Sequence, residues 1–243
     1  MNKAVSVEPT VEAASTPRPT ATVGFERRGP AQVVPSVDTA DKVVFLTIDD
    51  GLDPDPRLLR YLVENHIPAT AFLTTNTVTD WQYWKDIDPA ASVQNHTTVH
   101  PSLPKLGPAG QVREICAANQ TIAENTGRGP WMLRPPYGDY DASTLAAAGD
   151  CGLDWVVHWS VSLPGKALEY QKAGGSLKAG DIILTHFRKG LVKALPKVIE
   201  DIRAQGFELG RLEDYLPPRG VERVDRARMH MVTATESRAY PAG

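Results

Sequence analysis

The sequence predicts an α/β fold built on a parallel sheet. From about residue 42 to residue 216, short apolar runs of strand length alternate with segments of helical periodicity. The first run, 43–48, is apolar or β-branched throughout, which is typical of a strand covered on both faces. About seven strands in one alternating series suit a (β/α) barrel better than an open sheet.

The individual elements follow from local signals. Strands are expected at 43–48, 69–74, 92–94, 131–134, 155–159, 182–185 and 207–209. Helices are expected at 55–65, 108–126, 141–148 and 191–205. Asp141 is a suitable N-cap, and Gly127 and Gly206 are suited to end the helices before them.

The two ends of the chain lack apolar periodicity. Residues 1–40 contain five prolines and are predicted to be a disordered segment; residues 41–217 form the folded domain and 218–243 a mobile tail. Residues after Met1 show no apolar signal region, so the proline-rich segment is either a stalk or a disordered cytoplasmic tail.

Composition excludes some partners. The chain has 243 residues, of which 42% are hydrophobic and 23% charged, as in ordinary globular proteins. A formal net charge of -3 provides no basic field for nucleic acid. No apolar run reaches the roughly 18 residues of a membrane span. Nothing in the sequence demands an oligomer, and a monomer is expected.

Ionisable residues follow several predicted strands. Asp49 and Asp50 come after the first strand, and His96 and His100 come after the strand at 92–94. Arg134 and His186 end two later strands. Alone, each pattern is most often a turn, an exposed helical turn or a surface residue. Together they are predicted to meet, because the carboxyl ends of parallel strands lie at one edge of the sheet.

This set of side chains suits hydrolysis. Two histidines and one aspartate can hold a divalent metal ion and leave positions open, and histidines four apart can point the same way on one helical turn. The ion lowers the pKa of a bound water, and a second carboxylate can take its proton. His186 can protonate the leaving group. The predicted reaction is hydrolysis of an amide or ester.

Four stretches carry a family resemblance. They read TIDDG at 47–51, HTTVHP at 96–101, RPPYG at 134–138 and LTH at 184–186. With this order and spacing the chain resembles the polysaccharide deacetylases with the NodB homology domain, carbohydrate esterase family 4. The resemblance covers roughly 42–217 and implies a distorted (β/α) barrel with about seven parallel strands.

The resemblance also implies roles for the polar residues. Asp49 is implied as the general base, and Asp50, His96 and His100 as the ligands of one divalent ion, usually Zn²⁺. Arg134 is implied to orient the base by a hydrogen bond.

Further roles concern the substrate. The resemblance implies that the Tyr137 N–H stabilises the oxyanion, that Leu184 lines the acetyl pocket, and that His186 is the general acid. Trp159 is either one wall of the sugar groove or a core residue.

One motif departs from the family pattern. Ser162 stands where a carboxylate that pairs with Arg134 is usual, in the stretch 159–164. Two consequences remain open: a stronger contact between Asp49 and Arg134, or a less firmly held Arg134.

Cys116 and Cys151 are open to three interpretations by spacing alone: free core residues, a disulfide or a redox pair. The implied barrel makes the helices that carry them neighbours, so a disulfide is expected. A disulfide in turn implies an oxidising compartment, and hence an extracellular or cell-envelope location.

The function predicted first is metal-dependent removal of acetyl groups from N-acetylglucosamine glycans such as peptidoglycan or chitin. An acetylxylan esterase would share the mechanism. Amide hydrolysis on a non-sugar substrate and a non-catalytic glycan-binding homologue are the remaining alternatives. Ser162 is the one feature that favours the last of these.

Overall fold

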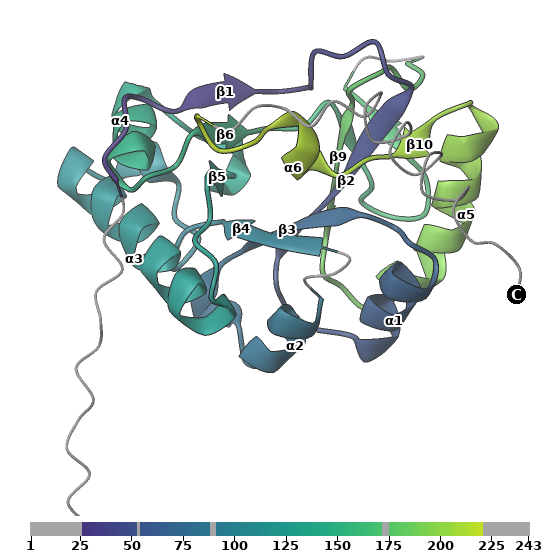
Figure 1. Ribbon diagram of the computed structural model, residues 1–243, viewed down its shortest axis with the longest axis horizontal. Coiled ribbons are helices and arrows are strands. Elements are labelled where there is room, and N and C mark those ends of the chain that lie inside the picture. Colours follow the sequence, from purple (N-terminus) through teal and green to yellow (C-terminus); the bar gives the residue numbers. More distant parts are fainter. Residues whose placement is uncertain (1–25, 53, 88–90, 172–174, 221–243) are drawn as a thin grey trace, which may run out of the picture.

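A curled sheet of mostly parallel strands forms the centre of the computed structural model, with helices around it (Figure 1). The structure describes residues 26–220 except 53, 88–90 and 172–174. The strands are β1 (Gln32–Val34), β2 (Val43–Asp50), β3 (Ala69–Leu73), β4 (Ala91–Asn95), β5 (Met132–Leu133), β6 (Trp155–Val157), β7 (Val161–Ser162), β8 (Glu169–Tyr170), β9 (Ile182–His186) and β10 (Glu208–Leu209). The predicted α/β class is confirmed.

The strand order is β1-β6-β5-β4-β3-β2-β9-β7-β8. Every neighbouring pair is parallel except β7 and β8, and β10 pairs in parallel with the first residues of β2. An antiparallel bridge between Ser36 and Asp181 links the chain after β1 to the start of β9. The sheet is therefore a half-barrel, in keeping with the distorted barrel that the sequence predicts.

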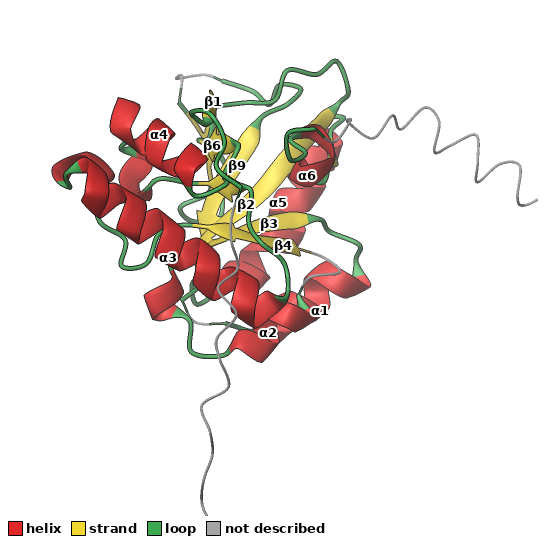
Figure 2. Cartoon of the chain, turned by 60° about the vertical axis from the view of Figure 1, so that its left-hand side comes forward, coloured by secondary structure: helices red, strands yellow, loops and turns green. Residues whose placement is uncertain are grey.

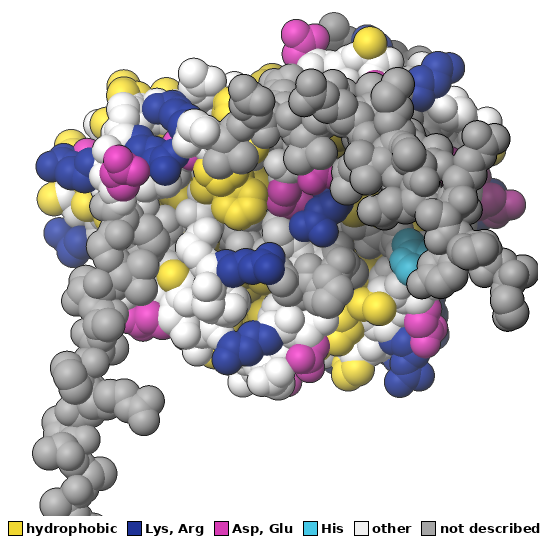
Figure 3. Space-filling model, viewed as in Figure 1, with side chains coloured by type: hydrophobic (Ala, Val, Ile, Leu, Met, Phe, Trp, Pro, Cys, Tyr) yellow, Lys and Arg dark blue, Asp and Glu magenta, His cyan; other side chains and the backbone are white. Residues whose placement is uncertain are grey.

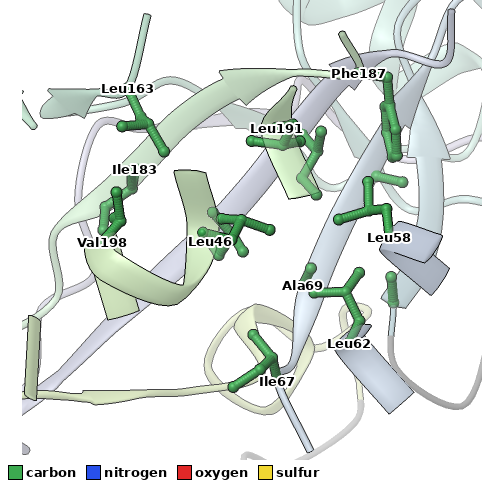
Figure 4. Packing of buried hydrophobic residues seen from close by; sticks show 14 of the residues in the cluster. Leu46, Leu58, Leu62, Ile67, Ala69, Leu163, Ile183, Phe187, Leu191 and Val198 are labelled. Carbon is green, nitrogen blue, oxygen red and sulfur yellow. The ribbon is translucent and has the colours of Figure 1, made fainter. Parts of the chain in front are cut away.

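Both faces of β2 are buried, as its apolar run predicts. Val44, Leu46 and Ile48 pack outward in a cluster with helix residues, part of which Figure 4 shows. Phe45 packs inside the curl, where Phe72 also lies. This alternation sends Thr47 and Asp49 to the interior as well, because side chains on a strand alternate between faces.

The helices are α1 (Pro56–Glu64), α2 (Trp81–Asp86), α3 (Pro108–Thr126), α4 (Ala142–Asp150), α5 (Leu191–Ala204) and α6 (Leu212–Tyr215), with 3₁₀ turns η1 (Thr75–Thr77), η2 (Leu103–Lys105) and η3 (Pro136–Gly138). All of these helices except α6 cover the outside of the sheet (Figure 2). The bounds predicted for α3 are confirmed, and Gly127 ends it with φ 79°. Asp141 caps α4 by accepting from the Thr144 N–H, as predicted.

The short helix α6 does not lie outside with the others. Leu212, Tyr215 and Leu216 pack among interior residues, and the Tyr215 ring meets the Phe45 ring edge-on at 5.0 Å. Phe45 lies early in β2, so α6 fills the interior at the amino ends of the strands. Apolar side chains of α6 thus pack at that end of the interior, and the buried Asp49 and Arg134 lie at the other.

The prediction that residues 1–40 are disordered is wrong for 26–40. β1 pairs with β6, and Arg28 forms an ion pair with the fully buried Asp154. Ala31 and Val34 are buried, so this segment covers apolar surface despite its prolines. Residues 1–25 lie outside the described residues.

The prediction that residues 218–243 form a mobile tail is wrong for 218–220. The Arg219 N–H donates to Asp154 and its guanidinium to the Pro30 carbonyl, so residues 218–220 are bound to the segment before β1. Residues 221–243 lie outside the described residues.

Cys116 on α3 and Cys151 at the end of α4 form a disulfide, with their Cα atoms 5.0 Å apart, which confirms that prediction.

Among the helices that the structure describes, none is long and apolar enough to cross a membrane. On the face in Figure 3, acidic and basic side chains are interspersed.

Candidate active site

The polar residues singled out by the sequence meet at the carboxyl ends of the strands. Asp49 and Asp50 end β2, His96 follows β4, and Arg134 follows β5. His186 ends β9 in register with Asp49 on β2. Register partners in parallel strands point to the same face, so His186 is on the side of the sheet that holds Asp49.

Within the described residues, Asp50, His96 and His100 form the one group of three His, Cys, Asp or Glu side chains that could hold a metal ion. Their donor atoms all lie within 4.8 Å of one another. Asp50 Oδ1 is 3.6 Å from Nε2 of His96 and 3.6 Å from Nε2 of His100. Two donors bound tetrahedrally at about 2.1 Å are about 3.4 Å apart, so the two distances from Asp50 are close to those around a Zn²⁺-sized ion.

The buried ring of His96 is oriented for this role. Its Nδ1 lies 2.6 Å from the Arg134 carbonyl oxygen. A carbonyl only accepts, so Nδ1 carries the proton and the lone pair of Nε2 faces Asp50. Burial lowers the pKa of His96, and the nearby Asp49 carboxylate opposes this shift. The neutral ring favoured by burial is the form that binds metal ions.

The expectation that His96 and His100 share a helical turn is wrong. Residues 96–100 form an irregular loop, with φ 68° at Thr97 and φ 60° at His100. The two rings still meet edge-on with centroids 4.8 Å apart. The left-handed turns bring them together, in place of helical periodicity.

A left-handed residue also explains how two consecutive carboxylates reach one site. Neighbouring residues on a strand face opposite ways. Asp50 has φ 77° and Gly51 φ 79°, so the regular strand ends between Asp49 and its neighbour. A side chain at position 51 would also collide with Leu73, 2.8 Å from an added Cβ.

Arg134 is fully buried and forms an ion pair with Asp49. Its Nη1 donates to Asp49 Oδ1 and to Thr47 Oγ1, each at 2.7 Å. The Phe72 ring lies under the guanidinium at 4.4 Å. Asp49 Oδ2 is thereby left 3.7 Å from His96 Nε2. Burial lowers the pKa of Arg134, and the adjacent Asp49 carboxylate opposes this.

The two outcomes left open by Ser162 can now be separated. Arg134 donates to the carbonyl oxygens of Val157 at 3.2 Å and His158 at 3.0 Å. These carbonyls and Thr47 fix the guanidinium without a second carboxylate. Arg134 is therefore firmly held, although Ser162, which lies on β7 in register with Leu184, supplies no carboxylate.

Tyr137 lies beside His100, one of the candidate metal ligands. The two rings meet edge-on at 4.7 Å, and Tyr137 is 68% exposed. With φ 61° it turns the chain, and the N–H groups of Gly138 and Asp139 donate to carbonyls just before it. Among the described residues no acceptor is found for the Tyr137 N–H, so this donor is available to a ligand.

Three further candidates surround the polar centre. Leu184 is buried on β9, two residues before the exposed His186, so both face the interior side. Trp159 is half-buried, 5.8 Å from the Arg134 guanidinium, and also packs on the interior apolar cluster. Trp159 thus touches the core and is partly exposed near the site, which is compatible with both interpretations of this residue.

Sequence reasoning missed several residues that are not part of the site but position the residues that are. Thr47 and Phe72 support Arg134, and Glu114 on α3 accepts from the N–H groups of Thr98 and Val99. Thr47 and Phe72 could have been found by strand alternation, because both share the face of Asp49. Glu114 carries no such signal, since its contact crosses 15 or 16 residues of chain.

Comparison with known proteins finds a family model and several similar chains. The family model described as polysaccharide deacetylase matches residues 36–156. An uncharacterized protein of Streptomyces coelicolor is 39% identical over 76% of this chain and 77% of its own length. The peptidoglycan-N-acetylglucosamine deacetylase of Listeria monocytogenes is 27% identical over 74% of this chain, which spans only 41% of that protein.

A solved structure extends the likeness to the fold. The family 4 carbohydrate esterase from Streptomyces lividans, in complex with acetate, is 27% identical. It superposes with a TM-score of 0.63 and covers 75% of this chain and 98% of its own.

Proposed function

Because the chain belongs to the polysaccharide deacetylase family, we propose that it removes acetyl groups from glycans that contain N-acetylglucosamine, such as peptidoglycan or chitin-type oligomers. The observation that carries the proposal is the position of Asp49. One of its oxygens is bound by Arg134, and the other lies 3.7 Å from the metal-facing nitrogen of His96. A base is thus held directly beside a metal-binding triad.

The triad Asp50, His96 and His100 would hold one divalent ion, and the donor set of one carboxylate and two imidazoles suits Zn²⁺. When bound, such an ion supplies an acidified water and polarises the carbonyl of the substrate. Removal of the ion with a chelator is expected to abolish activity, and Zn²⁺ to restore it.

Two side chains then carry out the proton transfers, and one main-chain N–H stabilises the developing negative charge. Asp49 takes a proton through Oδ2, since Oδ1 is engaged by Arg134. The Tyr137 N–H donates to the oxygen that becomes negative in the tetrahedral intermediate. His186, exposed across from Asp49 in register, protonates the leaving amine.

The acetyl group and the sugar need apolar surfaces. Leu184 lies on the same face as His186 and would line the pocket for the acetyl methyl. Trp159 presents its exposed part next to Arg134 and would form one wall of the sugar groove.

An extracellular or cell-envelope location is part of the proposal. It is supported by the disulfide between Cys116 and Cys151, because disulfides persist in oxidising compartments. A glycan of the cell envelope would be accessible there.

The test is release of acetate from chitooligosaccharides and peptidoglycan fragments, with acetylated xylan assayed beside them. The Zn²⁺-loaded wild type is expected to release acetate from the N-acetylglucosamine substrates. Asp49→Asn is expected to lower kcat/KM by about 10²–10⁴, the usual contribution of a general base. Asp86→Asn, an exposed carboxylate on α2, is the matched control and should leave the rate unchanged.

Three results would contradict parts of the proposal. Equal rates for Asp49→Asn and wild type would exclude Asp49 as the base. Faster release from xylan would assign the esterase function instead. Glycan binding without any turnover by the Zn²⁺-loaded protein would identify a non-catalytic glycan-binding homologue.

A further inference from the structure

We propose that Glu114 is a positioning residue for the metal site, because its carboxylate holds the loop that carries His96 and His100. The inference rests on the proposed function in that it assigns a metal ion to this loop. Glu114 lies on α3, outside the sheet, and is not one of the three grouped donors.

Glu114 bonds the loop through both its side chain and its main chain. Its Oε2 accepts from the N–H groups of Thr98 and Val99, each at 3.1 Å. Its carbonyl oxygen accepts from the Thr98 hydroxyl at 3.0 Å. Two consecutive N–H groups therefore converge on one carboxylate oxygen, and hydrogen bonds to an ionised acceptor are the stronger kind.

Other groups fix the loop on its remaining sides. The Asn95 side chain accepts from the Thr97 N–H at 2.8 Å, and the Thr97 hydroxyl accepts from the His100 N–H at 3.1 Å. Carbonyls of the loop accept from the N–H groups of η1. For the N–H groups of Thr98 and Val99, Glu114 is the acceptor that the described residues provide.

The loop needs such support because its backbone is strained. Thr97 and His100 both have positive φ, a conformation that costs a residue other than glycine free energy, most of all the β-branched Thr97, and that persists only when the surroundings impose it. Without Glu114, the two N–H groups between them would be free to turn toward water. The backbone at His100 would then relax.

The effect is expected mainly at His100. His96 is buried and is also held by the Arg134 carbonyl, whereas the His100 side chain is 29% exposed and contacts the Tyr137 ring. Its Nε2 must stay near Asp50 for the three donors to converge. Loss of an outer partner of this kind typically lowers metal affinity about 10–100-fold.

α3 is a suitable anchor for this contact. Asn95 donates to the Ile115 carbonyl and to Asn119 on the same helix, so the strand before the loop is fixed to the same face. Two residues beyond Glu114, Cys116 links the helix to α4. The carboxylate is thus presented from a part of the molecule that is itself immobilised.

The experiment measures the Zn²⁺ affinity of metal-free protein by competition with a chelating dye. Glu114→Ala is expected to weaken binding about 10–100-fold. Glu124→Ala removes the same charge from an exposed position on α3 and is expected to bind as wild type. Wild-type affinity in Glu114→Ala would overturn the proposal.

Two conservative variants separate position from charge. Glu114→Gln keeps an acceptor of the same length, whereas Glu114→Asp keeps the charge on a shorter side chain. The proposal expects Gln to retain more affinity than Asp. An affinity that follows charge alone, with Asp like wild type and Gln like Ala, would overturn it.

Thermal unfolding of the metal-free variants controls for folding. Should Glu114→Ala not fold, the comparison of Gln with Asp still decides. A wild type that binds no Zn²⁺ would remove the metal from the proposed function. A wild type that binds Zn²⁺ but releases no acetate would refute the reaction while leaving the test of Glu114 intact.

Discussion

The interior of the half-barrel buries a carboxylate at each end, and the two are stabilised differently. At the carboxyl end, Asp49 is 2% exposed and is paired with the buried Arg134. At the amino end, Glu213 on α6 accepts from the hydroxyls of Thr70 and Ser92. Its nearest cation, Arg211, is 4.0 Å away and 43% exposed.

This difference shows what each end requires. Burial raises the pKa of Glu213, and its hydrogen bonds oppose the shift only in part. The amino end therefore buries a structural carboxyl group whose charged form is disfavoured. The carboxyl end instead buries the Arg134 guanidinium beside the Asp49 carboxylate. Burying both charges costs desolvation free energy, and the proposed reaction needs a charged carboxylate at this position.

Arg134→Met should have the largest effect, because it leaves Asp49 buried without its cation. Loss of one partner of a buried ion pair typically costs about 3–5 kcal/mol, and activity should be lost with the base misplaced. Urea unfolding and acetate release measure the two effects. Arg203→Met removes an exposed ion pair and should change stability by less than about 1 kcal/mol. Equal stability of both variants would break the contrast between the two ends.

Thr47→Val should have the next largest effect. It removes the hydroxyl that accepts from Arg134 and donates to the Ile183 carbonyl. The expected loss is about 1–2 kcal/mol in the free energy of unfolding, with a fall in kcat and little change in KM. Thr47→Ser keeps the hydroxyl and should retain both, whereas a purely packing role for the methyl group would leave valine like wild type and impair serine.

Glu213→Gln tests the amino end through pH. The folded-state pKa of Glu213 is raised above its ordinary value of 4.5, so its contribution is fully present below that value. It is lost as pH rises through the folded-state pKa. Glutamine should therefore flatten the fall in stability between the ordinary pKa of 4.5 and the raised folded-state pKa, and leave acetate release unchanged. Unfolding free energies of both proteins from pH 4 to pH 9 measure this, and a variant that loses activity would contradict the assignment.

Ser162→Asp should have the smallest effect. A carboxylate there would give Arg134 a second anionic partner, but two carbonyls and Thr47 already fix the guanidinium. We expect kcat/KM within about twofold of wild type and stability within about 1 kcal/mol, since a further partner adds little to a group already held. A tenfold change in kcat/KM, in either direction, would show that Ser162 tunes the site.

The sequence predicted those parts of the molecule whose cause is local. β2 was recognisable from its unbroken apolar run, and α4 from Asp141 at its start. The grouping of Asp50, His96 and His100 followed from the common direction of parallel strands. Each of these depends on neighbours in sequence or on one rule of topology.

What escaped prediction depends on distant contacts. β1 has three residues between Pro30 and Pro35, too few to show alternation, and is formed by pairing with β6. α6 has four residues and is held by burial in the interior. The left-handed turns at Thr97 and His100 are imposed from outside the loop, so the HxxxH spacing alone indicated the wrong local structure.

The left-handed residues also bear on protein engineering. Among the described residues, five other than glycine have positive φ; four are Asp50, Thr97, His100 and Tyr137, and the fifth is the exposed His66 after α1. Replacing any of these with glycine would relieve backbone strain, but only His66 lies away from the site. Thermostable variants should therefore be sought at His66, at the end of α1. Selection for stability alone would favour replacement of the other four residues and so change the geometry around the proposed metal ligands.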